Sequence, residues 1–149
     1  MRFFAGLVLG TLLVSSWVAS AMEIVHSKGS SVLPDGLPFS EAVRVGDVLY
    51  LSGQVGVVPG QLVLVSGGLG PETHQTLRNI KTVLGANGLG LADIIRCTVM
   101  LADITEWDMF NDIYKSYFSA PYPARSAMGV NGLALGARVE VECTAAFGN

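Results

Sequence analysis

The chain has 149 residues, of which 50% are hydrophobic and only 14% are charged. This balance excludes a disordered chain, and roughly 100–200 residues is the usual size of one domain, so we expect a single folded domain. The formal net charge of −3 argues against a nucleic-acid-binding protein, because such proteins bind phosphates through a basic surface. Two cysteines and two isolated histidines form no metal-binding motif, so a bound metal is not expected.

Residues 1–21 have the composition of a secretory signal peptide. Arg2 provides the positive start, an apolar run follows over Phe3–Val14, and Ala19-Ser20-Ala21 offers the small residues that a signal peptidase requires. An uncleaved membrane anchor is the alternative, because Phe3–Ala21 is long enough to span a bilayer. No second apolar run of that length follows, so we expect an exported protein, periplasmic or secreted, with no stable membrane span after cleavage.

The rest of the chain divides into a lead-in and one domain. Residues 22–37 are rich in Ser, Gly and Pro and are expected to be extended, and residues 38–149 are expected to form the domain. The expected elements are strands over Glu41–Val45, Asp47–Val55 and Gln61–Val65, a helix over Pro71–Ala86, a strand over Ile94–Leu101, a helix over Glu106–Phe118 with Thr105 as N-cap, and strands over Arg125–Val130 and Ala137–Phe147. This order predicts an α+β fold, a mixed β-sheet with two helices packed on one face.

The two cysteines lie in expected strands. Cys97 and Cys143 each share the parity of apolar neighbours, so two small buried hydrophobic side chains are the favoured interpretation. Export would place them in an oxidising compartment, where a disulfide is possible. Bridging depends on the distance between the two Cα atoms, so the sequence leaves both interpretations open.

Charged residues gather in the last two expected strands. Arg125 and Glu140 are nearly symmetric about a turn rich in Gly and Asn, so a closing antiparallel hairpin would bring them to the same level. Strand alternation places Glu140 on one face with Arg138 and Glu142, and apolar residues on the core face. By composition alone, a solvated face with a cross-strand ion pair is the favoured interpretation.

Six short motifs together resemble the RidA (YjgF) family. They are Pro38-Phe39-Ser40-Glu41-Ala42-Val43, Gly46-Asp47…Tyr50-Leu51-Ser52-Gly53-Gln54, Thr73…Asn79-Ile80-Lys81…Leu84, Asn111…Tyr114…Phe118, Pro123-Ala124-Arg125-Ser126 and Val139-Glu140-Val141-Glu142. Each motif is weak alone, but they follow the family order with near-family spacing over almost the whole mature chain. The resemblance implies a chorismate-mutase-like α+β protomer that assembles into a homotrimer, with sites in the clefts between neighbouring subunits.

The resemblance also implies an activity, the hydrolysis of reactive 2-imino (enamine) acids to 2-oxo acids and ammonia without a cofactor. Arg125 matches the family arginine that grips the substrate carboxylate, and a guanidinium suits that task because it makes two parallel hydrogen bonds to a carboxylate. Glu140 matches the family glutamate that holds and activates water. The implied substrate-binding residues are Phe39, Ser52, Gly53, Asn111, Arg125 and Ala127.

Two hypotheses of function follow from these residues. The first is a periplasmic imine deaminase that uses Arg125 and Glu140, and the second is a non-catalytic module of the same fold in which Arg125 captures a small carboxylate. Phe39 stands where many deaminating members have Tyr, so a pocket hydroxyl is missing. The ribonuclease role assigned to some members is disfavoured by the negative charge and the export signal.

Overall fold

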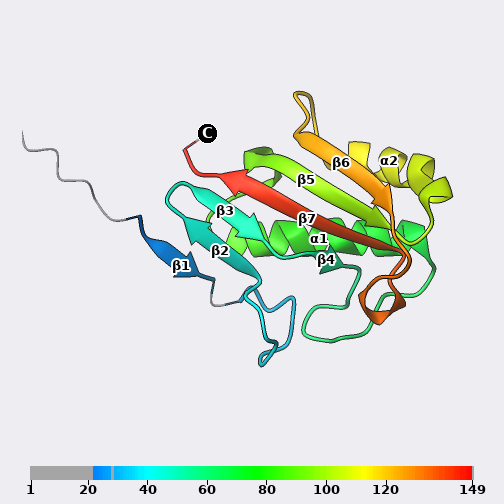
Figure 1. The fold of residues 1–149 in the computed structure, drawn as a ribbon, viewed down its shortest axis with the longest axis horizontal. Coiled ribbons are helices and arrows are strands. Elements are labelled where there is room, and N and C mark those ends of the chain that lie inside the picture. The colour runs from blue at the N-terminus through cyan, green and yellow to red at the C-terminus, as the bar shows by residue number, and fades with distance from the viewer. Residues whose placement is uncertain (1–21, 28, 149) are drawn as a thin grey trace, which may run out of the picture.

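The structure is a computed structural model that describes residues 22–27 and 29–148, so the expected signal peptide lies outside the described residues. Its strands are β1 (Ile24–His26), β2 (Ala42–Val45), β3 (Val48–Leu51), β4 (Gln54–Val55), β5 (Ile94–Leu101), β6 (Ala124–Gly129) and β7 (Val139–Ala146), and its helices are α1 (Leu69–Ala86) and α2 (Trp107–Lys115). The strands form one sheet in the order β1-β2-β3-β7-β5-β6, with β4 paired to β7 (Figure 1).

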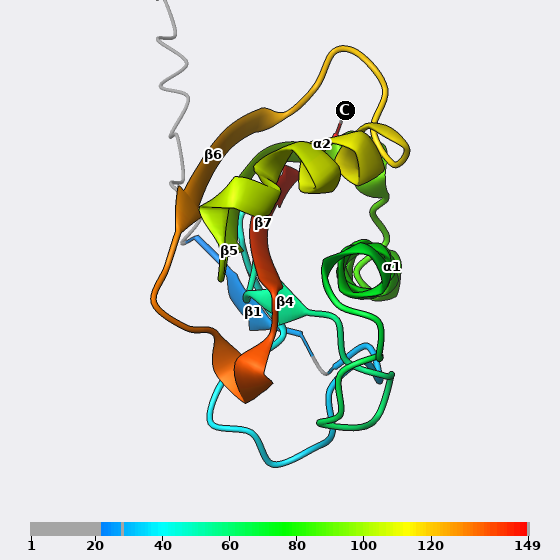
Figure 2. The same cartoon turned by 90° about the vertical axis from the view of Figure 1, so that its right-hand side faces the viewer.

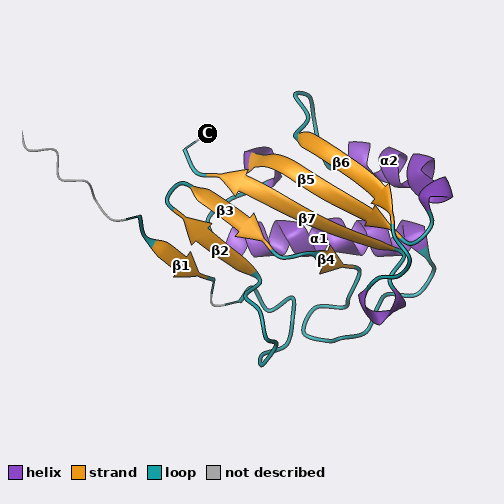
Figure 3. Cartoon of the chain, viewed as in Figure 1, coloured by secondary structure: helices purple, strands orange, loops and turns teal. Residues whose placement is uncertain are grey.

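Both helices cover the same face of the sheet. Figure 2 shows α1 and α2 side by side against the concave side of the curved strands, and Figure 3 shows the central strands crossing in front of α1. The core lies between these layers, where α1 buries Leu77, Ile80 and Leu84 at helical spacing and α2 buries Phe110. The predicted α+β sheet with two helices on one face is confirmed.

Several elements differ from the expected ranges. Within residues 22–37 the chain forms β1, which pairs antiparallel with β2. The third apolar run makes only an isolated bridge, between Val57 and Leu64. Helix α1 begins two residues before the expected Pro71, and α2 begins after a short turn that Asp103, rather than Thr105, caps by accepting a hydrogen bond from the Thr105 N–H (2.9 Å).

The predicted closing hairpin is wrong. Strand β5 lies between β6 and β7, because β6 pairs parallel with β5 on one side and β7 pairs antiparallel with β5 on the other. The segment from β5 through α2 to β6 is a β-α-β unit, and such a crossover returns the chain parallel to its starting strand. Arg125 is therefore level with Cys97 and Cys143, three residues away from the level of Glu140.

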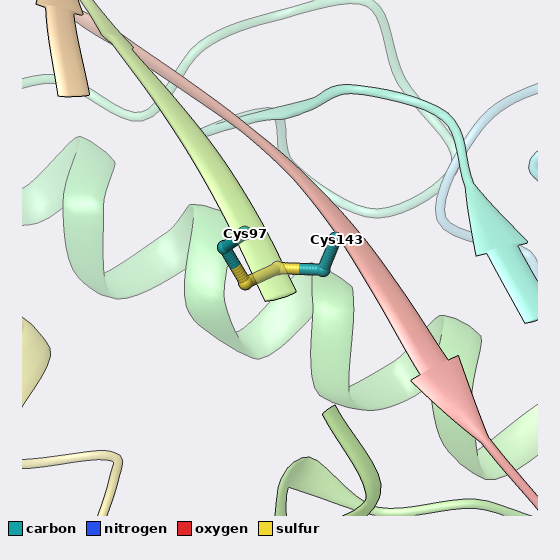
Figure 4. Close-up of a disulfide and its surroundings, with 2 residues drawn as sticks. All are labelled: Cys97 and Cys143. Atoms are coloured by element: carbon teal, nitrogen blue, oxygen red, sulfur yellow. A yellow bond between two sulfur atoms is a disulfide. The ribbon is translucent and has the colours of Figure 1, made fainter. Parts of the chain in front are cut away.

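A disulfide joins Cys97 on β5 to Cys143 on β7 (Figure 4). The two residues are direct cross-strand partners, their Cα atoms are 4.1 Å apart, and each is 1% exposed. The expectation of burial is confirmed, but the favoured interpretation of two free side chains is wrong. Pairing between β5 and β7, which strand patterns alone do not reveal, brings the two Cα atoms together.

Within residues 22–27 and 29–148, none of the helices combines the length and the apolar composition that crossing a bilayer would require.

Candidate functional site

The sheet face opposite the helices carries a cleft of about 410 Å³ with Glu140 in its wall. Strand β7 alternates between buried and more exposed residues, which turns Val139 and Val141 into the core and Glu140 to the other face, as the sequence predicts. Phe39, Ser52 and Gly53 line the same cleft, so the structure brings four of the predicted site residues together.

Gly53 lies directly against the Glu140 carboxylate. It occupies the irregular step between β3 and β4, where both strands pair with β7. A methyl group added at Gly53 would overlap Glu140 Oε1, so only glycine allows the backbone this close to the acid. Burial, with a smaller contribution from the negative charge of Glu142, raises the pKa of Glu140 above its ordinary value. A carboxylate beside an open cleft can accept a proton from a bound water molecule.

Glu41 shapes the cleft without lining it. Its buried carboxylate accepts hydrogen bonds from the backbone N–H groups of Ser30 and Leu33 (2.8 Å for Leu33), which fixes the lead-in segment beside the cleft. The Ser52 hydroxyl donates to the Ser40 carbonyl (2.7 Å), which holds the two walls together. Sequence reasoning missed the role of Glu41, because its partners are 8 and 11 residues away and meet it only when the lead-in folds back.

Arg125 lies on the opposite face of the sheet, near its edge. Its Nη2 donates to Asn111 Oδ1 (2.6 Å), and its guanidinium carbon lies 4.6 Å from the centroid of the Tyr114 ring. Asn111 and Tyr114 are one turn apart on α2, so the helix positions the arginine through a hydrogen bond and a cation–π contact. Burial raises the pKa of Tyr114 to about 12, while the charge of Arg125 acts in the opposite direction.

A second hollow, of about 330 Å³, surrounds the guanidinium. Lys115, Tyr122 and Pro123 line it together with Tyr114 and Arg125. A planar guanidinium at the mouth of such a hollow can bind a carboxylate through two parallel hydrogen bonds. Ala127, on the same strand and of the same parity as Arg125, packs against the core and lies outside the Glu140 cleft.

One protomer therefore does not unite Arg125 with Glu140. Arg125 is level with Cys143 and shares its face, whereas Glu140 is three residues from Cys143 and faces the other way. Strand geometry puts their Cα atoms about 10 Å apart along the strands and about 10 Å apart across them. The cross-strand ion pair considered from the sequence is absent from the described residues.

Arg138 also departs from the predicted face. It precedes β7, and its Nη2 lies 2.6 Å from Glu106 Oε2 beside the start of α2. Among residues 22–27 and 29–148, no three His, Cys, Asp or Glu side chains gather in a way that could hold a metal ion.

Comparisons with known proteins agree on one family. Residues 33–147 match the family described as endoribonuclease L-PSP. A human protein named 2-iminobutanoate/2-iminopropanoate deaminase is 42% identical over 111 residues, which cover 74% of this chain and 81% of the human protein. A crystal structure of RidA from an Antarctic Psychrobacter is 31% identical with a TM-score of 0.77, covering 83% of this chain and 99% of that one. A crystal structure of E. coli TdcF with bound serine is 27% identical with a TM-score of 0.76, with the same coverage.

Proposed function

This chain belongs to the RidA (YjgF) family, and from that premise we propose that it hydrolyses 2-imino acids to 2-oxo acids and ammonia. The name of the human relative supports the reaction, and the serine bound to E. coli TdcF supports a site for small molecules with a carboxylate. The observation that carries the proposal is the half-buried Glu140 carboxylate, held against the Gly53 backbone in an open cleft.

A site that uses both charged residues takes Arg125 from one subunit and Glu140 from its neighbour. The two lie on opposite faces of one sheet, and Arg125 is on the edge strand β6, where a neighbouring copy can approach it. When the same contact repeats around a closed ring, every site combines the Arg125 of one subunit with the Glu140 of the next subunit. We assign this arrangement to a homotrimer.

The reaction follows from these two groups. Arg125 binds the substrate carboxylate through two parallel hydrogen bonds and thereby fixes the imine carbon. Glu140 holds a water molecule and accepts a proton from it as the oxygen adds to that carbon. The imine nitrogen enters protonated, so the neutral adduct carries a hydroxyl and an amino group on one carbon. Glu140 returns its proton to the amino nitrogen and is again a carboxylate. The C–N bond then breaks as the hydroxyl gives its proton to Glu140, which leaves the 2-oxo acid and ammonia, and ammonia takes that proton from Glu140 to depart as ammonium.

Export of the protein is part of the proposal. A disulfide such as Cys97–Cys143 forms and persists in oxidising compartments and is rare in the cytosol. This bond therefore supports the signal peptide expected at residues 1–21, and the imine source would lie outside the cytosol.

The test of the reaction is the rate of ammonia release from freshly generated 2-iminopropionate. We expect Glu140→Gln to lower kcat by about 10²–10⁴-fold, the usual contribution of a general base, while it keeps binding of the product, pyruvate. Arg125→Ala is expected to lose both turnover and binding. Pyruvate binding by the wild-type protein without any acceleration of imine hydrolysis would instead support the carboxylate-binding module.

Mixed oligomers test the shared site. If Arg125 and Glu140 come from different subunits, co-assembly of Arg125→Ala with Glu140→Gln restores intact sites at about a quarter of the interfaces, because each interface samples the two variants independently. Each variant alone stays inactive. An inactive mixture in which both variants are shown to have co-assembled would contradict the two-subunit site.

A further inference from the structure

The Glu140 cleft has an apolar interior that the reaction itself does not require. Of the twelve described residues that line it, eight carry apolar side chains, and the largest of these are Leu33, Leu37, Phe39, Leu62 and Leu135. Among the residues that the structure describes, Glu140 is the only charged one in the lining. An acidic substrate side chain would be repelled by that carboxylate, and an apolar side chain would be removed from water.

The size of the cleft exceeds what a small imino acid fills. 2-Iminopropionate has six non-hydrogen atoms and occupies about 180 Å³ if each atom takes the ~30 Å³ of a liquid water molecule. The corresponding imino acid derived from leucine has nine such atoms and occupies about 270 Å³ on the same basis. In a single chain the cleft has about 410 Å³, which exceeds the larger molecule and the attacking water together by about 110 Å³ and leaves space for the guanidinium that the neighbouring subunit contributes.

Leu135 adds an independent observation. Its backbone has φ 60° and ψ 7°, the left-handed region that leucine rarely adopts, and its side chain is 53% exposed at the mouth of the cleft. Strained residues of this kind concentrate at binding sites, where the surrounding structure holds them in place. Glycine or asparagine would fit the same turn without that cost, so the turn itself gives no reason for leucine.

We propose that the Glu140 cleft selects 2-imino acids with a branched or otherwise large apolar side chain over 2-iminopropionate, with Leu62 and Leu135 contacting that side chain. The inference rests on the proposed deaminase function and names the substrate class of the same site. Each added methylene in an apolar pocket changes discrimination by about 10–200-fold. The leucine-derived imine therefore has a kcat/KM at least about 10-fold above that of 2-iminopropionate.

The test compares the two imines, generated in the assay from alanine and leucine by an amino-acid oxidase. Leu62→Asn and Leu135→Asn are expected to lower the leucine-to-alanine ratio of kcat/KM by about 10-fold, because each places a polar group against the substrate side chain. Asparagine also tolerates the backbone of Leu135. Val63→Asn is the matched control, because Val63 is 58% exposed on the same loop but does not line the cleft.

Calorimetry with the product acids, pyruvate and 4-methyl-2-oxopentanoate, gives a second readout that does not depend on turnover. Tighter binding of the larger acid, lost in Leu62→Asn and kept in Val63→Asn, supports the inference even if neither imine is hydrolysed, in which case the proposed reaction alone fails. If both imines are hydrolysed and the leucine-to-alanine ratio of kcat/KM is the same in the wild type and in all variants, the inference is overturned and the proposed reaction stands. A change of oligomeric state in Leu62→Asn and Leu135→Asn with unchanged selectivity also overturns it, because the cleft would then hold a neighbouring copy.

Discussion

The Glu140 half and the Arg125 half of the candidate site are held in place by different means. Glu140 lies on β7, the strand that pairs with β3, β4 and β5, and the Gly53 backbone presses against its carboxylate. Arg125 lies on the edge strand β6, and two side chains of α2 hold its guanidinium. The acid is thus fixed by backbone packing, whereas the arginine depends on individual side chains, so single substitutions should affect the two halves differently.

The Cys97–Cys143 bond connects these halves, because it joins β7, which contains Glu140, to β5, the strand that pairs with β6. The chain-entropy estimate for a bond that closes a 46-residue separation is about 4 kcal/mol. We expect Cys97→Ala with Cys143→Ala, or reduction of the wild-type protein, to lower the free energy of unfolding by that order, measured by urea titration. Reduction of the double variant is the control and should change nothing. Equal unfolding midpoints for oxidised and reduced wild-type protein would contradict the prediction.

The sequence predicts the surroundings of Glu140 better than those of Arg125. Local patterns were enough for the two helices, the alternation of β7 and the placement of Glu140 away from the core, because burial on one strand is a local property. The order of strands is not local. Arg125 was assigned to a hairpin with Glu140, although the β-α-β order before it indicates a parallel neighbour instead.

The disulfide and the position of Glu41 were out of reach for the same reason. Cys97 and Cys143 are partners only because β5 inserts beside β7, and the contacts of Glu41 depend on how the lead-in folds back over β2. The family motifs identified Phe39, Ser52, Gly53 and Glu140 as neighbours, and the structure places these four in one cleft. The resemblance implies a site between subunits, but the motifs do not show which of these residues lies on which face, and the structure places Arg125 on the other face of the sheet.

Apart from substitutions of Arg125 and Glu140 themselves, Gly53→Ala should lower kcat the most, because it acts on the Glu140 half of the site. The added methyl group must displace the carboxylate, and a displacement of about 1 Å can cost about 100-fold in rate. We expect kcat on 2-iminopropionate to fall by that order while pyruvate binding at Arg125 is kept. Gly132→Ala is the control, because nothing lies within 4 Å of its added methyl group. Wild-type kcat in Gly53→Ala would show that the close approach has no catalytic role.

Asn111→Ala should affect the Arg125 half alone. The substitution removes the oxygen that accepts from Arg125 Nη2, and a hydrogen bond to a charged group contributes about 1.5–3 kcal/mol, or roughly 10–100-fold. We expect KM for 2-iminopropionate to rise by about that factor with kcat nearly unchanged, because Asn111 positions the arginine without meeting the reacting atoms. Met109→Ala, at an exposed position of the same helix, should leave KM unaltered. A fall in kcat without a change in KM would place Asn111 in the chemical step instead.

Glu142→Gln should produce the smallest effect, and only in the Glu140 half. Burial raises the pKa of Glu140 most, and the charge of Glu142 raises it further, so removing that charge lowers the pKa toward its ordinary value. Glu140 acts as a base only when ionised, so activity falls as the pH drops through its pKa. This acid limb of the pH–rate profile should move to lower pH in Glu142→Gln, with the plateau unchanged.

The same substitution should affect stability. A folded-state pKa of Glu140 above the unfolded value stabilises the protein at low pH, and this stabilisation is lost as the pH rises through the folded-state pKa. Glu142→Gln should therefore also be slightly more stable than the wild type at neutral pH. Asp47→Asn is the control, because Asp47 is an exposed carboxylate that does not influence Glu140, and it should shift neither the pH–rate profile nor the pH–stability profile. If the acid limb stays in place in Glu142→Gln, Glu140 is not the base whose titration limits the rate.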